Sequence, residues 1–269
     1  MRMKKQKLVV VITTFDLDAL RVSVPPLRRL RRKFTLVIYN DNPTRRLSRR
    51  DIWKMGWRGP MYIINSENNV GEFESRIRAI EFIAENKIDA DWIMFADDDD
   101  VLIDIGVPDV ANNAFAVVQN ATILSDSHVD MFKINPSWAN GADVGKTGPH
   151  FEITGTMIRA TIMFEFATVV RSVMSQIAGV IGSCRYRIPF GALMWNMLNC
   201  VVKIRHPELA PIYMNRTNYI SIKLARPHEK YGISTISGIA SIRATNIAAK
   251  KIYKLVEIAA AQNLVADGQ

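Results

Sequence analysis

Cysteine is scarce in this sequence: the chain has Cys184 and Cys200, which can form at most one disulfide bridge. Neither lies in a CxxC or CxxCH spacing, so the sequence lacks the usual patterns of zinc, dithiol and c-type haem sites. Low cysteine content favours a reducing compartment. We therefore expect a cytoplasmic protein, or one of the host cytoplasm if its source is viral.

Long hydrophobic runs are also lacking. The uncharged stretch from Ile188 to Val202 is too short to span a bilayer as a helix and contains a proline and a glycine. The basic first residues lead into an apolar run that ends at Phe15 without a small-residue cleavage site. We expect neither a transmembrane segment nor a signal peptide, and the composition is that of a folded domain.

Acidic residues are few in the first 60 residues, which hold 16 Lys and Arg against 4 Asp and Glu. This segment therefore carries a net charge of +12, and the remaining residues must sum to −3 to give the total of +9. The excess lies in two basic clusters, at 28–33 and 45–50. Such clusters form either a solvated face or a surface for phosphate-bearing partners, such as nucleic acid or anionic membrane.

Short apolar runs that alternate with polar segments predict the fold class. Residues 7–13, 34–39, 61–65 and 91–96 read as strands, and the first is a β-branched run typical of a strand buried on both faces. Residues 71–84 have apolar positions at helical spacing, and 18–33 is long enough for a crossover helix. We expect an α/β protein with a mostly parallel sheet flanked by helices and ligands at the strand carboxyl ends.

The second half of the sequence is less regular. Residues 129–134 and 151–158 read as strands, 161–178 as a buried helix, and 239–261 as a C-terminal helix, whereas 186–236 resist assignment. No internal repeat or linker is evident. We expect a single domain over 1–269, with an irregular part at 105–236 and the C-terminal helix within 237–269.

Four adjacent carboxylates, Asp97 to Asp100, follow the run at 91–96. Adjacent carboxylates repel one another, and a bound cation relieves that repulsion. Oxygen ligands suit Mg²⁺, Mn²⁺ or Ca²⁺, and in an extended segment Asp97 and Asp99 would point to one side and Asp98 to the other. The alternative is an acidic loop without a function. The glycine and glutamate of an EF-hand loop are missing.

An ordered set of motifs resembles the GT-A glycosyltransferases of the family 2 type. Residues 9–16 are similar to the family's opening strand, 38–43 to its second strand and acidic turn, and Asn69-Val70-Gly71 with Arg76 to its Asn-x-Gly loop and helix arginine. Residues 92–102 are similar to the strand that leads into its Asp-x-Asp (DxD) motif. The likeness covers residues 7–104, which would form the nucleotide-sugar-binding half, with 105–236 as the acceptor half.

The resemblance implies a role for each matching residue. The base would lie against Phe15, its polar edge or the ribose would bind Thr14 and Asp41, Arg76 would approach the base or phosphates, and Asp98 would take the ribose hydroxyls. Mn²⁺ or Mg²⁺ would be held on the donor diphosphate by Asp99, with Asp97 directly or through water, and the late His228 resembles a histidine that completes the metal site in some members. The donor would be a nucleotide sugar, most simply a UDP-sugar. Plain alternatives are that Phe15 is core and that Arg76 pairs with Glu72.

The general base of inverting members has no match, because 180–235 contains only Glu208 and Glu229 as acidic residues. Asp143, His150 or Glu152 could provide the base. The enzyme could instead be retaining, with the leaving phosphate transferring the proton, or catalysis could have been lost.

The basic segment bears on the acceptor. A lipid-linked or cell-surface glycan at an anionic membrane would suit it, and so would a modified base in DNA, a substrate known for phage enzymes of similar size. Trp53, Trp57 and Trp138 could stack on an extruded base, although core packing is the more ordinary use of tryptophan. Lacking a membrane anchor, the sequence slightly favours DNA. Alternatives of another class are a metal-dependent phosphoesterase or nuclease and a non-catalytic nucleotide-binding protein.

Overall fold

The computed structural model describes residues 6–30, 33–105, 113–125, 152–184, 190–223 and 236–267. Its strands are β1 Leu8–Thr14, β2 Thr35–Asn40, β3 Met61–Asn65, β4 Trp92–Asp97, β5 Val101–Leu102, β6 Ala114–Ser125, β7 Met157–Arg159 and β8 Ala210–Lys223. Its helices are α1 Leu20–Leu27, α2 Arg49–Lys54, α3 Glu72–Glu85, α4 Ala160–Ser172, α5 Met174–Ser183, α6 Phe190–Arg205 and α7 Ile236–Asp267. The predicted strand at 129–134 lies outside the described residues.

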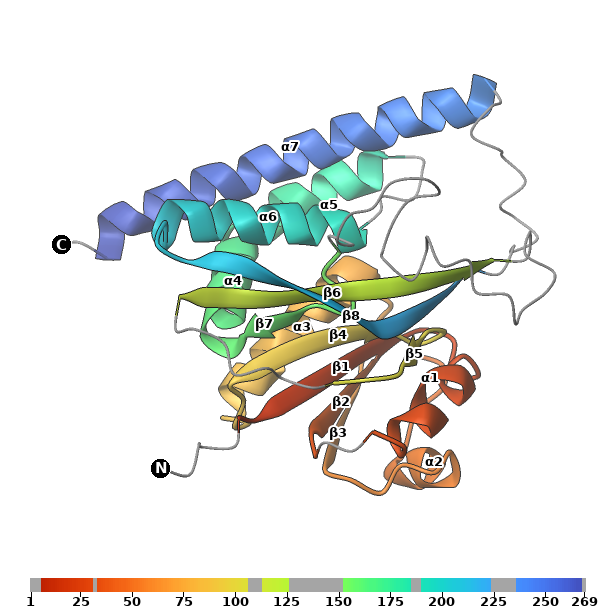
Figure 1. The fold of residues 1–269 in the computed structure, drawn as a ribbon. Coiled ribbons are helices and arrows are strands. Elements are labelled where there is room, and N and C mark those ends of the chain that lie inside the picture. The colour runs from red at the N-terminus through yellow and green to blue at the C-terminus, as the bar shows by residue number, and fades with distance from the viewer. Residues whose placement is uncertain are drawn as a thin grey trace, which may run out of the picture.

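All eight strands belong to one sheet, in the order β3-β2-β1-β4-β7-β6-β8-β5 (Figure 1). β1 pairs in parallel with β2 and β4, and β2 pairs in parallel with β3. β7 is antiparallel to both β4 and β6, β6 and β8 are parallel, and β5 is antiparallel to β8. The predicted α/β class with a mostly parallel sheet is confirmed.

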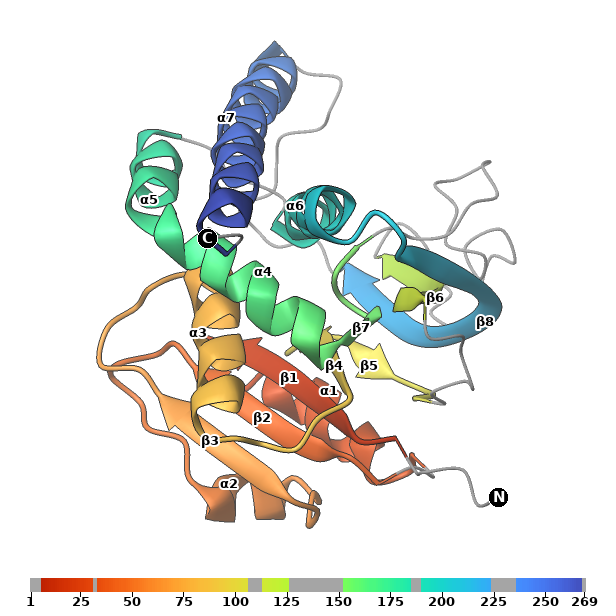
Figure 2. The same cartoon turned by 90° about the vertical axis from the view of Figure 1, so that its left-hand side faces the viewer.

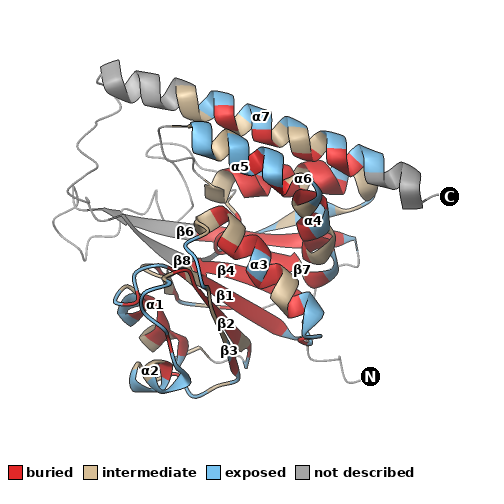
Figure 3. Cartoon of the chain, turned by 180° about the vertical axis from the view of Figure 1, so that it is seen from behind, coloured by how far each residue is buried: buried red, intermediate tan, exposed pale blue. Residues whose placement is uncertain are grey.

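Helices cover both faces of the sheet. α1 and α2 lie on one face, while α3, α4, α6 and α7 cover the other, as Figure 2 shows. β1 serves both cores: Val9 and Val11 pack toward α3, and Val10 and Ile12 toward α1. The central strands are buried along their length (Figure 3), as the β-branched run at 7–13 predicts.

Two predicted elements are shorter in the structure than in the prediction. α1 ends at Leu27, well before Lys33, because Pro25 and Pro26 lack the N–H groups that continue a helix. The expected strand at 151–158 shrinks to β7, because Gly155 has a φ of +78° that interrupts an extended chain.

The helix expected over 161–178 is instead two helices, α4 and α5, bent by 69°. Val173 joins them with a φ of −121° and a ψ of 13°, which no helix continues. Its neighbours Met174 and Ile177 are buried against the core. Together these helices pass a length-and-hydropathy test for a membrane span only as a bent pair, and within the described residues no single helix passes it.

Residues 186–236, which the sequence left unassigned, contain α6 and β8. The predicted C-terminal helix at 239–261 is confirmed and extends from Ile236 to Asp267 as α7. Cys184 and Cys200 are both free thiols.

Candidate functional site

The predicted site residues from the first hundred positions gather at the carboxyl-end edge of the parallel strands. Thr14 ends β1 and pairs with Asn40 at the end of β2, while Thr13 pairs with Asp97 at the end of β4. The segments that follow these strands therefore meet at one edge, as expected for a parallel sheet.

The acidic segment is a turn. The amide of Asp100 approaches the Asp97 carbonyl at 3.4 Å, and the chain then enters β5. The extended alternation expected for Asp97, Asp98 and Asp99 is wrong, because the chain reverses here instead of continuing as a strand. Each carboxylate therefore has its own surroundings, and Asp100 is buried.

Arg76 holds Asp97. Its Nη2 lies 2.6 Å from Asp97 Oδ1 and 3.1 Å from Glu72 Oε1. The predicted pairing with Glu72 is therefore present, and Arg76 pairs with Asp97 as well. The side chain is buried, its guanidinium lies 5.7 Å from the Phe95 ring centre, and its Nε and Nη1 have no hydrogen-bond partner in the described structure. An arginine placed in this way fixes one carboxylate of the acidic turn.

The Asp98 carboxyl lies partly buried beside the other carboxylates of the turn. Burial raises the pKa of its carboxyl to about 7, and the charges of Asp99 and Asp97 add to the rise. A hydrogen bond with the Thr14 side chain opposes the shift. Asp98 and Thr14 are therefore neighbours, as the predicted shared contact with the ribose and base requires.

Asp41 is buried and fully engaged with the protein backbone. Its Oδ1 accepts a hydrogen bond from the Val70 amide and its Oδ2 one from the Gly71 amide, both at 2.8 Å. Gly71 has a φ of +83°, a conformation that favours glycine. Asp41 thus fixes the loop that starts α3, and its predicted contact with a base stays a prediction.

Phe15 is 53% exposed, so the alternative that it is a core residue is wrong. Its carbonyl accepts a hydrogen bond from Asn42 Nδ2 at 3.0 Å. Asn40, which sequence reasoning did not single out, is buried and donates to the Arg45 carbonyl and to Asn65 Oδ1. These asparagines connect the loops after β1, β2 and β3. Their positions at the ends of predicted strands are the sequence feature that could have identified them.

Of the three candidate bases, Glu152 alone lies in a described segment. The segment that follows it runs beside β4, where Thr154 bridges to Phe95 and the Gly155 amide donates to the Phe95 carbonyl at 2.9 Å. The Glu152 carboxylate lies against the start of α6, close to Gly191. Asp143, His150 and His228 lie outside the described residues.

The carboxylates of the acidic turn offer the oxygen ligands that Mg²⁺ and Mn²⁺ prefer. Within the described ranges, no group of three or more His, Cys, Asp or Glu side chains could hold an ion by itself. An ion at this turn would therefore take its further ligands from a bound diphosphate and water, which is how Mg²⁺ commonly binds nucleotides.

Trp57 is buried and stacks on Phe34 with a centroid distance of 4.6 Å, so it is a core residue and not a stacking partner for a base. Trp53 is exposed on α2, with the Arg58 guanidinium 5.6 Å from its ring centre. Trp138 lies outside the described part of the chain.

No protein-family model matches the chain, and no curated protein matches it significantly. Among solved structures, residues 1–349 of the glycosyltransferase TarS of S. aureus match with a TM-score of 0.51 and 11% sequence identity. The match covers 81% of this chain and 60% of that chain. The fold of this protein is therefore GT-A-like.

Proposed function

We propose that this protein is a metal-dependent glycosyltransferase that moves a sugar from a nucleotide sugar, a UDP-sugar in the simplest case, to an acceptor hydroxyl. The observation that carries the proposal is the acidic turn after β4, which lies beside Thr14 and against Arg76 at the ligand-binding edge of a GT-A-like sheet. A phosphoesterase would need the carboxylates but not this arrangement of loops.

The chain's own residues would divide the work of donor binding. Phe15 offers an exposed ring to the base, and Asp41 holds the Val70–Gly71 loop that closes that side of the site. Asp98 would accept hydrogen bonds from the ribose hydroxyls next to Thr14. Arg76 neutralises Asp97 and keeps it aimed at the edge.

Asp99, with Asp97 directly or through water, would hold Mn²⁺ or Mg²⁺ on the donor diphosphate. Such an ion supplies Lewis-acid stabilisation of the departing nucleoside diphosphate. Glu152 is the described candidate for a general base, because its segment runs along β4 toward the same edge. A retaining reaction would need no such base.

For the acceptor we propose a base in DNA. Arginines on and beside α1 and α2 give one face of the sheet an excess of positive charge, and a phosphate backbone is the partner that such a face attracts. A glycan at an anionic membrane surface is the alternative that the experiments below separate from it.

A thermal-shift screen tests the proposal. Nucleoside diphosphates and nucleotide sugars are added with and without Mn²⁺, and we expect a rise in Tm that is specific for one nucleotide and depends on the metal. Binding with slow donor hydrolysis would support an enzyme, whereas binding without any turnover would favour the non-catalytic alternative. Cleavage of phosphate esters without nucleotide-sugar binding would contradict the proposal.

A further inference from the structure

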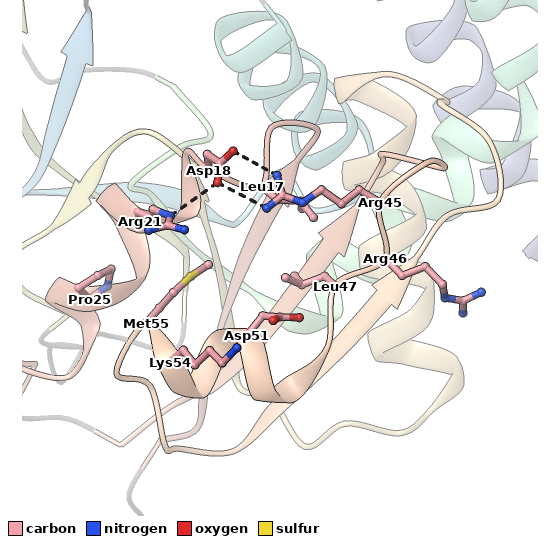
Figure 4. A pocket seen from close by; sticks show the side chains of 10 residues that line it. All are labelled: Leu17, Asp18, Arg21, Pro25, Arg45, Arg46, Leu47, Asp51, Lys54 and Met55. Carbon is pink, nitrogen blue, oxygen red and sulfur yellow. Dashed lines mark hydrogen bonds and ion pairs between the residues drawn. The ribbon is translucent and has the colours of Figure 1, made fainter.

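A cavity of about 600 Å³ opens between α1, α2 and the segment after β2 (Figure 4). Its volume is in the range of small-molecule sites, roughly 300–1,000 Å³. None of the donor-site residues above lines it. Its lining residues are Leu17, Asp18, Arg21, Pro25, Arg45, Arg46, Leu47, Asp51, Lys54 and Met55.

The charged side chains of this cavity leave an excess of positive charge. Asp18 serves two arginines, since its Oδ2 lies 3.1 Å from Arg45 Nη1 and its Oδ1 lies 3.6 Å from Arg21 Nε. Asp51 accepts hydrogen bonds from the amide and hydroxyl of Ser48, as the cap of α2. The lining therefore holds four cations against two carboxylates, a net charge of +2, and the charge of Asp51 acts on both Lys54 and Arg45.

The guanidinium groups keep donors available. An arginine has five N–H donors, and Asp18 can satisfy only part of those on Arg21 and Arg45. Arg46 points away from the other side chains in Figure 4, so the rim facing the cavity consists of Arg21, Arg45 and Lys54. Three cations around one opening are suited to a phosphate group, which presents several acceptor oxygens.

The floor of the cavity is apolar. Leu17 and Leu47 are buried beneath it, and Pro25 and Met55 are half-buried at its sides. A free inorganic phosphate would leave this floor uncovered. A ligand that joins a phosphate to a flat, partly apolar group, as a nucleotide does, would cover both parts.

The cavity is also connected to the donor edge. The Asp18 amide donates to Asp16 Oδ1 at 3.0 Å, and the Arg45 carbonyl accepts from Asn40 Nδ2 at 2.7 Å. Its walls are therefore continuations of the two loops that carry Phe15 and Asp41. The cavity therefore lies on the side of the edge where the base of the donor is proposed to bind.

We propose that this cavity binds one nucleotide unit of a single-stranded stretch of DNA, with the phosphate on Arg21, Arg45 and Lys54 and the sugar and base over Leu17 and Met55. The inference rests on the proposed function, in which DNA is the acceptor. A concave site takes phosphate-bearing units one at a time, which a nucleic-acid strand presents and a flat bilayer surface does not.

Fluorescence anisotropy with a labelled oligo(dT) of about 10 nucleotides tests the cavity at roughly 50 mM salt, where phosphate contacts are strong. We expect Arg21→Glu and Lys54→Glu each to weaken the oligonucleotide Kd by about tenfold. The log–log salt slope should fall by roughly 0.7 for each lost phosphate contact. Donor-induced Tm shifts should stay as in the wild type, because neither residue belongs to the donor site.

Two matched controls carry the same change of charge. Lys251→Glu lies on α7, on the opposite face of the sheet, and Arg29→Glu lies just after α1 but outside the cavity. Both should change the Kd by less than about threefold, the effect of a distant charge.

Equal weakening by Arg29→Glu would overturn the cavity site in favour of a diffuse basic face. Normal donor shifts without oligonucleotide binding would also overturn it while leaving the donor function standing. Binding to phosphatidylcholine–phosphatidylserine vesicles that depends on Arg21 and Lys54, with no binding to oligo(dT), would replace DNA by membrane. Oligonucleotide binding through the cavity without any donor shift would contradict the glycosyltransferase proposal instead.

Discussion

The two faces of the sheet use charge in opposite ways. On the face covered by α3 to α7, arginines meet carboxylates on other helices: Arg171 pairs with Glu81 at 2.6 Å and with Glu74, and Arg205 pairs with Glu165 at 2.6 Å. On the α1 and α2 face, Asp18 is shared by Arg21 and Arg45, and no described carboxylate pairs with Arg46 or Arg50.

On the first face, the charged side chains hold helices together. On the α1 and α2 face, several cations are left for a binding partner. Arg171 joins α4 to α3, and Arg205 joins α6 to α4. The Arg205 Nε also donates a hydrogen bond to the Ala260 carbonyl of α7. The α1 and α2 cations stand over a core made by apolar packing alone. The site lies at the edge where these two faces meet.

The largest effect is expected at that edge. Asp99→Asn should lower turnover by at least about 100-fold and remove metal-dependent nucleotide binding, because the carboxylate proposed to hold the metal is lost while its shape is kept. Steady-state rates and the Mn²⁺-dependent Tm shift measure this. Glu85→Gln, at the far end of α3, is the control that should behave as wild type, and full activity of Asp99→Asn would refute the metal assignment.

Asp41→Ala tests whether the buried carboxylate that holds the start of α3 is structural. It removes the acceptor of the Val70 and Gly71 amides, so the free energy of unfolding should fall by about 2–4 kcal/mol. Donor affinity should also weaken, by about 1–3 kcal/mol. Urea unfolding and donor titration separate the two effects, and an unchanged donor dissociation constant would contradict a role at the base.

Glu165→Ala tests the paired face. The Arg205 side chain is buried, and it would lose its carboxylate partner, as would His206, whose Nε2 lies 2.6 Å from Glu165 Oε2. We expect the free energy of unfolding to fall by about 1–3 kcal/mol. Asp18→Ala on the other face is the comparison variant, and its free energy of unfolding in urea should equal that of the wild type. An equal fall in the free energy of unfolding for both variants would contradict the proposed difference between the two faces.

The smallest effect is a pH dependence. Although burial raises it, the pKa of Glu165 is held below its ordinary value of 4.5 by hydrogen bonds from Arg205 and His206 and by their charges. A lowered pKa in the folded state stabilises the protein above the ordinary value and loses that effect as the pH falls through the lowered one. The stability difference between wild type and Glu165→Gln should therefore shrink as the pH falls below 4.5; a difference that grows in that acidic range would contradict the shift.

The first hundred residues were predictable because each strand there is a short apolar run followed by its own turn signal. β1 to β4 and α3 fall within one residue of the expected positions. α2 was missed although its capping box, Ser48 with Asp51, is a readable start signal, because the helix has six residues and one buried position, Ile52.

The later elements depend on distant partners and gave weaker signals. β8 pairs with β6 and β5, which lie about a hundred residues earlier in the chain, and its sequence mixes apolar, asparagine and arginine positions. At the site, the residue types indicated the acidic turn. The ion pair between Arg76 and Asp97 and the hydrogen bonds that Asp41 accepts from two amides depend on the tertiary structure. No spacing in the sequence predicts those contacts.

The short strand β7 joins two parts of the sheet. Three residues, Met157–Arg159, are all that β7 places between the parallel set that ends with β4 and the set that begins with β6. Backbone hydrogen bonds at such a seam open at lower free energy than those of long central strands. Amide hydrogens of β7 should therefore exchange with solvent earlier than those of β1, and the sheet should open there first, between the half that carries the donor edge and the half that carries α6 and β8.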